Sequence, residues 1–351
     1  MLKKYLQIIL AVVINTTIFS TKKRLVKRII LFSILIPFFN VDATFAQPYK
    51  LVALGSSTTA GFGATTMDSS WVGRLKKYYE CRLNQSNVVF NLGRSGYDNY
   101  FAMPTGYTPP PTRPNPDAAF NVSKACIYLN DLPNNGNGVV IINYPTNNFD
   151  KYSIPEIMIS LQVIYDSVST LGHRCFITTT QPRTDINFDN SVVKKKLSLI
   201  KDSIIQRFGA ANTINFWDGM FNAADTSVLP EYSFGDFVHF NDAGHRVLFE
   251  RVLAKNVFNL PIWYAKSTGN LNELTTWGSN KDGSGNNPAS FSQDFAEYYI
   301  EKNLLPTINA NWFISGINVR VIVGDGINPV NLKIPAAQKI TVSSLLKINC
   351  F

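Results

Sequence analysis

The sequence predicts an α/β fold of three layers, in which a five-stranded parallel sheet lies between helices, followed by a small β-rich module. Two observations predict this fold. Short hydrophobic runs alternate with amphipathic helical stretches between residues 47 and 260. Over residues 261–351 the composition shifts toward Asn, Gly, Ser and Thr, with short β-type runs separated by turn signals. A chain of 351 residues is long enough for one large domain and a smaller one.

The strands of the sheet are predicted from runs that are hydrophobic almost without interruption. Such runs are typical of parallel strands that are buried on both faces. The five runs are YKLVAL (49–54), VVFNL (88–92), VVIINY (139–144), CFITTT (175–180) and TINFW (213–217). Helical stretches lie between and after them, at 71–83, about 117–130, 154–171, 190–208 and 241–257. This alternation predicts a parallel sheet with helices on both faces.

One segment interrupts the alternation. MPTGYTPPPTRPNPD (103–117) contains six prolines and can form neither a helix nor a central strand. It follows the second strand, at the carboxyl end of the sheet, where loops that contact substrate commonly lie. The segment is either such a loop or a surface excursion without a role, and its sequence favours neither.

The first 46 residues have the pattern of an export signal. A basic run at 22–28 precedes the apolar run 29–39, which is too short to span a membrane, and small Ala46 precedes Gln47. We expect cleavage after Ala46 and a secreted, cell-surface or periplasmic protein. The upstream stretch MLKKYLQIILAVVI is either a first membrane segment or, as we favour, the result of a start codon assigned too early, so that residues 1–21 are not translated.

The charge of the chain gives no support for a nucleic-acid partner. The formal net charge is +9, but residues 1–46 carry +6 of it and the remainder only +3. A charge concentrated in a targeting segment does not make a basic binding surface. The four cysteines show neither CxxC spacing nor a Cys/His cluster, so no metal site is expected. Export permits disulfides, and the sequence leaves open how these cysteines pair: Cys81, Cys126, Cys175 and Cys350.

The β-rich module is predicted from the runs EYYIEK, NWFISG, VRVIVG, VNLKIP and KITVSSL. Their spacing is typical of the first part of a longer β repeat or solenoid. Three tryptophans lie in this module, Trp263, Trp277 and Trp312. They either pack in a core, which we favour, or bind glycans on the surface.

The stretch VALGSSTTAGFGA (52–64) places a serine directly after the first strand. A phosphate-binding loop is excluded because no lysine follows and the glycines are too far apart, and Thr66 breaks the dinucleotide pattern GxGxxG. The GxSxG elbow is also absent. A serine at a strand-to-helix turn exposes its hydroxyl beside backbone N–H groups, which suits a nucleophile. The alternative is that Ser57 only caps the helix.

A nucleophilic serine needs a base, which is usually histidine. Of three histidines, His173 is expected on a surface turn and His245 on the surface or interface of the last helix. His239 lies in a loop three residues after Asp236. One short turn can then present the carboxylate to one ring nitrogen and leave the other for the serine.

Two later segments supply hydrogen-bond donors for an oxyanion. NLGRSG (91–96) follows the second strand, and Gly96 can bring its N–H close to a reacting carbonyl. NYPTNN (143–148) follows the third strand and offers the amide of Asn147 or Asn148. Each segment taken alone also reads as an ordinary turn.

Four blocks in this order resemble the SGNH or GDSL-type hydrolase superfamily over roughly residues 49–257, in a secreted bacterial branch. The resemblance implies a flavodoxin-like fold and a catalytic triad of Ser57, His239 and Asp236. It also implies an oxyanion hole formed by Ser57, Gly96 and Asn147, and a mechanism that needs no metal or organic cofactor. Ser56 and Asn148 stand where the family has aspartates. Four residues are candidates to contact substrate: Ser56, Asn148, Gln181 and Arg183, the last of which an ion pair would explain equally well.

The resemblance implies a secreted serine hydrolase that cleaves carboxylic esters, such as O-acetyl groups on carbohydrate. Lipids and thioesters are alternative substrates within the same family. A different class of function is a non-catalytic surface protein, in which the hydrolase scaffold has decayed and the β-rich module binds glycans or a cell surface. Retention of the serine, the histidine and the aspartate favours the enzyme.

Overall fold

The computed structural model describes residues 49–132, 137–183, 190–222, 227–236, 238–301, 307–324 and 334–342. The chain divides into two units, Met1–Ala46 and Gln47–Phe351. The predicted export signal and Cys350 lie outside the described residues, as does most of the predicted strand VNLKIP. Among the described helices, none has the length and apolar character needed to cross a membrane.

The predicted five-stranded parallel sheet is confirmed. Its strands are β1 (Lys50–Gly55), β2 (Val89–Gly93), β3 (Gly138–Asn143), β4 (Arg174–Thr178) and β5 (Thr213–Ile214). Their order is β2-β1-β3-β4-β5, and every neighbouring pair is parallel. This is the flavodoxin-like strand order. The strands β4 and β5 end sooner than predicted, at Thr178 and Ile214, whereas β1 and β2 each run one residue further, to Gly55 and Gly93.

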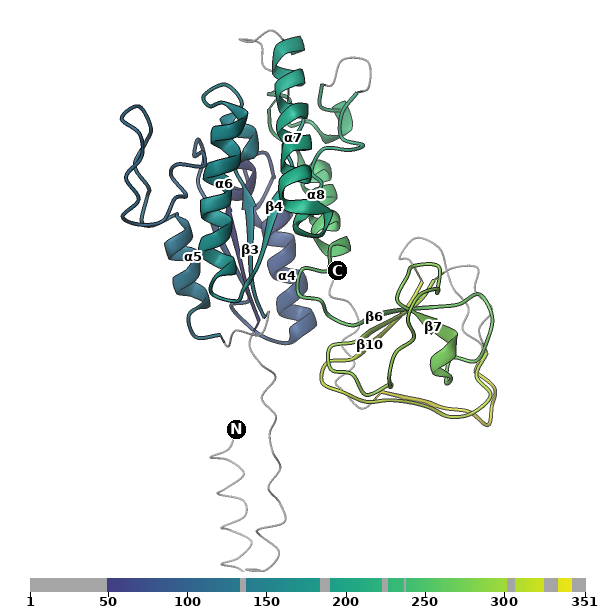
Figure 1. Ribbon diagram of the computed structural model, residues 1–351. Coiled ribbons are helices and arrows are strands. Elements are labelled where there is room, and N and C mark those ends of the chain that lie inside the picture. The colour runs from purple at the N-terminus through teal and green to yellow at the C-terminus, as the bar shows by residue number, and fades with distance from the viewer. Residues whose placement is uncertain are drawn as a thin grey trace, which may run out of the picture. The chain divides into compact units, whose positions relative to one another are not determined.

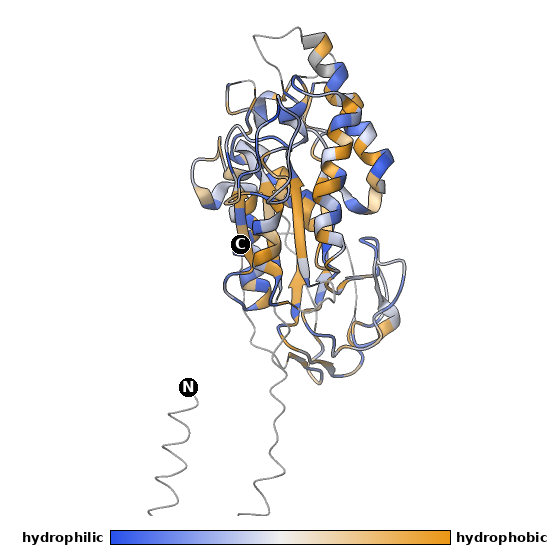
Figure 2. Cartoon of the chain, turned by 60° about the vertical axis from the view of Figure 1, so that its left-hand side comes forward, coloured by the Kyte–Doolittle hydropathy of each residue, from blue (hydrophilic) through white to orange (hydrophobic). Residues whose placement is uncertain are grey.

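Helices cover both faces of the sheet, as Figure 1 shows. Alternate residues of each strand point to opposite faces. In β1, Val52 and Leu54 share one core with helices α5 (Val122–Leu129), α6 (Ile154–Ser169) and α7 (Asn190–Asn212). Leu51 and Ala53 share the other core with α4 (Trp71–Leu83) and α8 (Asp242–Ala254). The central strands are accordingly hydrophobic along their length, whereas the helices carry both colours in Figure 2.

The proline-rich segment 103–117 is fastened to α6. The guanidinium of Arg113 donates two hydrogen bonds to the Glu156 carboxylate, at 2.6 and 3.0 Å. It also lies over the ring of Tyr152, 4.6 Å from the ring centroid. A paired, bidentate contact of this kind fixes direction as well as distance. The helix α5 begins only at Val122, later than predicted, where the Asn121 side chain accepts from the Lys124 N–H.

The residues after 261 form two further sheets of short strands. The first has the order β10-β8-β6-β7, from strands Arg320–Val323, Glu297–Ile300, Ile262–Ala265 and Trp277–Gly278. The second pairs β9 (Trp312–Ile314) with β11 (Ile340–Val342). Parallel pairing of β6, β8 and β10, which lie far apart in the chain, is the geometry of stacked solenoid coils. Trp277 and Trp312 are buried in the core of this module, in line with the interpretation we favoured.

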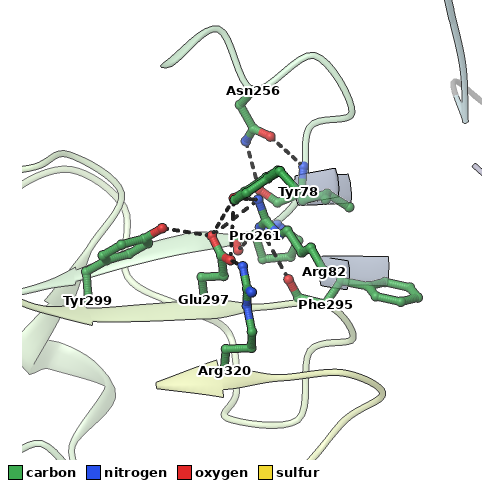
Figure 3. A network of polar contacts seen from close by, with 9 residues as sticks. Tyr78, Arg82, Asn256, Pro261, Phe295, Glu297, Tyr299 and Arg320 are labelled. Carbon is green, nitrogen blue, oxygen red and sulfur yellow. Dashed lines mark hydrogen bonds and ion pairs between the residues drawn. The ribbon is translucent and has the colours of Figure 1, made fainter. Parts of the chain in front are cut away.

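A cluster of buried charges attaches the β-rich module to α4 (Figure 3). We call it the module contact; it consists of Tyr78, Arg82, Glu297, Tyr299 and Arg320. The Glu297 carboxylate is fully buried and accepts hydrogen bonds from the hydroxyls of Tyr78 and Tyr299, at 3.2 and 3.0 Å. It is paired with Arg82 at 3.3 Å and with Arg320. Every donor around this carboxylate therefore comes from α4 or from the module's own strands.

The cysteines divide into two kinds. Cys81, on α4, is disulfide-bonded. Cys126 and Cys175 are free, and burial raises the pKa of both thiols. A buried thiol with a raised pKa is a poor nucleophile, which leaves these two cysteines a packing role.

Candidate active site

The carboxyl ends of neighbouring strands bring the predicted residues to one edge of the sheet. Gly55 of β1 lies in register with Gly93 of β2 and with Asn143 of β3. Backbone hydrogen bonds continue one residue further, from the Arg94 N–H to the Gly55 carbonyl and from the Ser56 N–H to the Asn143 carbonyl. The loops that carry the serine, the glycine and the asparagine therefore begin side by side. We call these strand ends, with that of β4 and the loops that follow, the catalytic edge.

Ser57 is the first residue of the short helix α3 (Ser57–Ala60), and its hydroxyl lies 2.8 Å from Nε2 of His239. The cap position belongs to Ser56, whose side chain makes no capping hydrogen bond. Ser57 is therefore not the residue that caps this helix, and the alternative role given to it above does not hold. Its hydroxyl faces a ring nitrogen contributed from 182 residues further along the chain.

The turn Asp236–His239 orients the imidazole. One carboxylate oxygen of Asp236 accepts the N–H groups of Val238 and His239, at 3.0 and 2.8 Å. The other oxygen lies 2.6 Å from Nδ1 of the His239 ring. Partial burial raises the pKa of Asp236, but these hydrogen bonds outweigh it and hold that pKa below its ordinary value. The ionised carboxylate accepts a hydrogen bond from the Nδ1–H of the ring, which leaves Nε2 without a proton and able to accept a hydrogen bond from Ser57.

Backbone donors beside Ser57 are available for an oxyanion. Within the described residues, the N–H groups of Ser57 and Gly96 donate to no acceptor. Gly96 has a φ of 81°, in the left-handed region that favours glycine, and this conformation turns the chain after β2. Asn147 lies in the 3-10 turn η3 (Pro145–Asn148), and its side-chain amide donates to the Tyr97 carbonyl at 3.1 Å. That bond uses one N–H of the amide and leaves the second N–H available for an oxyanion.

Gln181, which the sequence predicts as a residue that contacts substrate, connects two loops of the catalytic edge. Its side-chain oxygen accepts from the hydroxyl of Thr58, next to Ser57, at 3.0 Å. Its backbone N–H donates to the hydroxyl of Thr146, next to Asn147, at 2.8 Å. Gln181 is buried, and in the part of the chain that the structure describes its side-chain Nε2 has no partner. The glutamine therefore ties the serine turn to the asparagine turn.

A second buried bridge runs parallel to the first. The Asn143 amide donates to the Thr59 hydroxyl at 3.1 Å, and the Thr178 hydroxyl donates to the Asn143 side-chain oxygen at 2.8 Å. All three side chains are buried. Sequence reasoning missed both bridges, because a contact between side chains at separate strand ends depends on the register of the strands. The only signal was the repeat of threonine at the ends of the first and fourth strands.

The other predicted contact residues lie close to the site but in different settings. Ser56 is buried, and Asn148 is fully buried and accepts from the Asn99 N–H at 3.2 Å. Arg183 lies over the ring of Phe149, 5.0 Å from its centroid. Asn148 therefore fastens the loop after β3 to the loop after β2, which is a contact that an uncharged amide can make.

The two remaining histidines are buried. This corrects the expectation that His173 lies on a surface turn, whereas His245 lies at an interface of the last helix, which was one of its two expected positions. His245 accepts from the Trp71 N–H at Nδ1 and donates from Nε2 to the Phe62 carbonyl, at 3.3 and 3.0 Å. His173 packs against Gly138, where a β-carbon would lie 2.5 Å from its Nδ1. Burial lowers the pKa of both rings. Neither contacts Ser57. Over the described residues, no group of three or more His, Cys, Asp and Glu side chains could hold a metal ion.

Comparison with known proteins gives one family match. The model of the GDSL-like lipase/acylhydrolase family matches residues 53–247, a stretch that contains Ser57, Gly96, Asn147, Asp236 and His239. No curated protein matches the chain.

Several solved structures are similar in part. The lipase Lip_vut3 from a goat rumen metagenome is 16% identical, with a TM-score of 0.43; the match covers 60% of this chain and 98% of that one. A GDSL-like lipase from Bacteroides thetaiotaomicron is 16% identical, with a TM-score of 0.42 and coverage of 63% and 96%. The psychrotrophic esterase EstA from a Pseudoalteromonas species is 14% identical, with a TM-score of 0.40 and coverage of 59% and 96%.

Proposed function

This chain belongs to the GDSL-like lipase/acylhydrolase family, and we propose that it hydrolyses carboxylic esters with Ser57 as the nucleophile. The observation that carries the proposal is the hydrogen-bonded series of Ser57, His239 and Asp236, with contacts of 2.8 and 2.6 Å. A nucleophile within hydrogen-bond reach of a base, itself oriented by a carboxylate, is the geometry that acyl transfer needs.

In the first half of the reaction, Ser57 Oγ attacks the ester carbonyl carbon while His239 Nε2 takes the hydroxyl proton. The carbonyl oxygen becomes an oxyanion, which the N–H groups of Ser57 and Gly96 and the Asn147 amide stabilise. The carbon–oxygen bond to the alcohol then breaks, and His239 returns the proton to the leaving alcohol oxygen. The product is an acyl ester of Ser57.

In the second half, a water molecule attacks the acyl carbon and gives a proton to His239. The bond to Ser57 Oγ breaks, and His239 returns that proton to the serine as the carboxylic acid leaves. Asp236 stays ionised throughout, because its pKa lies below its ordinary value. It stabilises the imidazolium that forms twice in each cycle. Apart from the ester and the water molecule, all the groups that act in these steps belong to the chain. The proposed mechanism therefore uses no cofactor.

We propose O-acetyl groups on carbohydrate as the substrate class, and a site of action outside the cytoplasm. The support is the predicted export signal at residues 1–46, since esters met outside the cell include acetylated polysaccharides. Lipid esters and thioesters are the alternatives within the family. Glycan binding by the β-rich module stays a separate prediction. Trp277 and Trp312 are buried, so other residues of the module would have to contact the glycan.

A chromogenic acetate ester tests the proposal on the full chain. The wild type should hydrolyse it, and Ser57→Ala should reduce the rate to background. Ser203→Ala is the matched control, because its hydroxyl lies on the exposed side of α7 and bonds only within that helix. Equal rates for the wild type and Ser57→Ala would overturn the assignment of the nucleophile.

A further inference from the structure

Two exposed phenylalanines lie beside the catalytic imidazole. The ring centroid of Phe62 is 4.3 Å from that of His239, and Phe234 meets Phe62 edge-on at 5.7 Å. Phe62 is 46% exposed and Phe234 is 51% exposed. Single exposed apolar side chains are common on protein surfaces. Here the two contact each other and one of them contacts a catalytic ring, so they form an apolar surface beside the catalytic imidazole.

Main-chain hydrogen bonds tie each phenylalanine to a catalytic residue. The Phe62 N–H donates to the Ser57 carbonyl, and the Phe234 N–H donates to the His239 carbonyl, both at 2.9 Å. The Phe62 carbonyl accepts from the buried ring of His245 at 3.0 Å. The next residue, Gly63, packs so closely that a β-carbon there would lie 2.1 Å from the Phe240 carbonyl oxygen. These contacts hold both backbones in fixed positions relative to the triad.

The role of the imidazole decides which part of an ester this surface meets. To protonate the leaving alcohol, Nε2 must come within hydrogen-bond reach of the alcohol oxygen, roughly 2.6–3.2 Å. The alcohol therefore leaves on the imidazole side, whereas the acyl oxygen is held by Ser57, Gly96 and Asn147. Because Phe62 packs on the imidazole, the carbon atoms next to the alcohol oxygen are the ones that come closest to the two rings.

Resting on the proposed ester hydrolysis, we propose that Phe62 and Phe234 form an alcohol-side subsite that binds the apolar C–H face of the leaving alcohol. Neither side chain carries a polar atom, so the subsite recognises area and shape rather than hydrogen bonds. A pyranose ring and an alkyl chain both offer such a C–H face. The subsite discriminates large alcohols from small ones and is indifferent to the length of the acyl chain.

Two substrate series on the full chain test this subsite. One keeps the acetyl group and varies the alcohol: methyl acetate, an acetylated methyl pyranoside and octyl acetate. The other keeps the methyl alcohol and varies the acyl chain from acetate to octanoate. The variants are Phe62→Ala and Phe234→Ala. Phe313→Ala is the control, because Phe313 is similarly exposed but lies on β9 of the module.

We expect each variant to lose about tenfold in kcat/KM on the large-alcohol acetates and less than about twofold on methyl acetate, which matches the loss of one aromatic contact. A larger loss on the pyranoside than on octyl acetate identifies a sugar alcohol, and a larger loss on octyl acetate identifies an alkyl alcohol. An equal loss on methyl acetate, or a loss that follows acyl length, would overturn the subsite. If the wild type hydrolyses none of these esters, the proposed function fails instead, and the two failures are distinct.

Discussion

The catalytic edge and the module contact stabilise the same chain by opposite means. At the catalytic edge the supporting bonds are neutral, from threonine hydroxyls, amides and backbone N–H groups, and the side chains of His239 and Asp236 stay 16% and 35% exposed. In the module contact one buried carboxylate binds two guanidinium groups and two phenol hydroxyls. Burial raises the pKa of Glu297, but Arg82 and Arg320 outweigh it and hold that pKa below its ordinary value.

The difference explains where each region tolerates change. Neutral hydrogen bonds contribute about 1 kcal/mol each, so a network of many such bonds survives replacement of one member. The two family aspartates can therefore be Ser56 and Asn148 here while Ser57 and His239 keep their contact. A buried charge left without its partner costs far more. Loss of one charged group should therefore destabilise the module contact as a whole. Loss of one hydrogen bond should weaken the catalytic edge only slightly.

The largest expected effect is on activity. Replacement His239→Ala should reduce kcat by about 10⁴- to 10⁶-fold, because the serine loses its base. The melting temperature should change little, since the ring is partly exposed and its partner Asp236 is a polar group that water can reach. Steady-state kinetics measure the loss of kcat, and thermal unfolding of the same sample measures the melting temperature. A loss of folding that accompanies the loss of activity would assign the ring a structural role.

The next effect is on stability and concerns the module contact. Replacement Glu297→Leu leaves two guanidinium groups without their carboxylate and should cost about 3–5 kcal/mol in the free energy of unfolding. Denaturant titration measures it, with Glu250→Gln as the control, because Glu250 forms an exposed pair with Arg246 that is worth under about 1 kcal/mol. Similar losses for the two variants would show that the module contact is not the anchor described above.

A graded loss is expected for the oxyanion donors. Replacement Asn147→Ala removes one donor and should lower kcat by about 10²- to 10³-fold with little change in KM, because the amide acts on the transition state. Steady-state kinetics with a soluble acetate ester measure kcat and KM separately. A rise in KM at constant kcat would place Asn147 in substrate binding instead.

A smaller effect is expected from the bridge between the two loops. Replacement Thr58→Val removes the hydroxyl that binds Gln181, and Gln181→Met removes its acceptor. Each should lower kcat by up to about tenfold, the worth of one buried neutral hydrogen bond, and the double variant should lose no more than the larger single loss. Thr180→Val is the control, since that hydroxyl binds the Leu197 carbonyl and not the catalytic loops. Additive losses would show that the two residues are independent.

The smallest effect is on the pH dependence of stability. Burial lowers the pKa of His245, and both of its ring nitrogens are committed to bonds that fit only the neutral ring. The unfolded chain takes up a proton at this residue near pH 6.5, whereas the folded chain takes it up only at a lower pH. Stability should therefore be complete above that pH and fall below it, by at most about 1.4 kcal/mol per unit. In His245→Asn the slope measured by denaturant titration should be shallower; an unchanged slope would contradict this origin.

Much of the sheet and the positions of the site residues follow from the sequence, because parallel strands bring their carboxyl ends to one edge. The motifs place a serine, Gly96 and His239 there, and the family resemblance selects Ser57 and Asn147. The bridges through Thr58 and Gln181 could not be predicted, since a contact between side chains at separate strand ends depends on register. His173 reads as a surface turn because nothing in its own segment shows that Gly138 leaves room for the ring.

The β-rich module was only partly predictable. The strands β8, β9, β10 and β11 coincide with predicted runs, whereas β6 and β7 were not predicted. Their place is set by pairing with distant strands. Phe62 and Phe234 were missed for a related reason: each lies next to glycine in a segment that reads as a loop, and only the fold brings the two rings together.

Covalent labelling with a fluorophosphonate tests the central claim most directly. Such probes react with a serine only when a neighbouring base and an oxyanion hole activate it. Intact mass spectrometry of the full chain should show one adduct, and peptide mapping should place it on Ser57. The adduct should be absent in Ser57→Ala and slow to form in His239→Ala. Labelling of Ser56 or another serine, or no labelling of the folded wild type, would contradict the account.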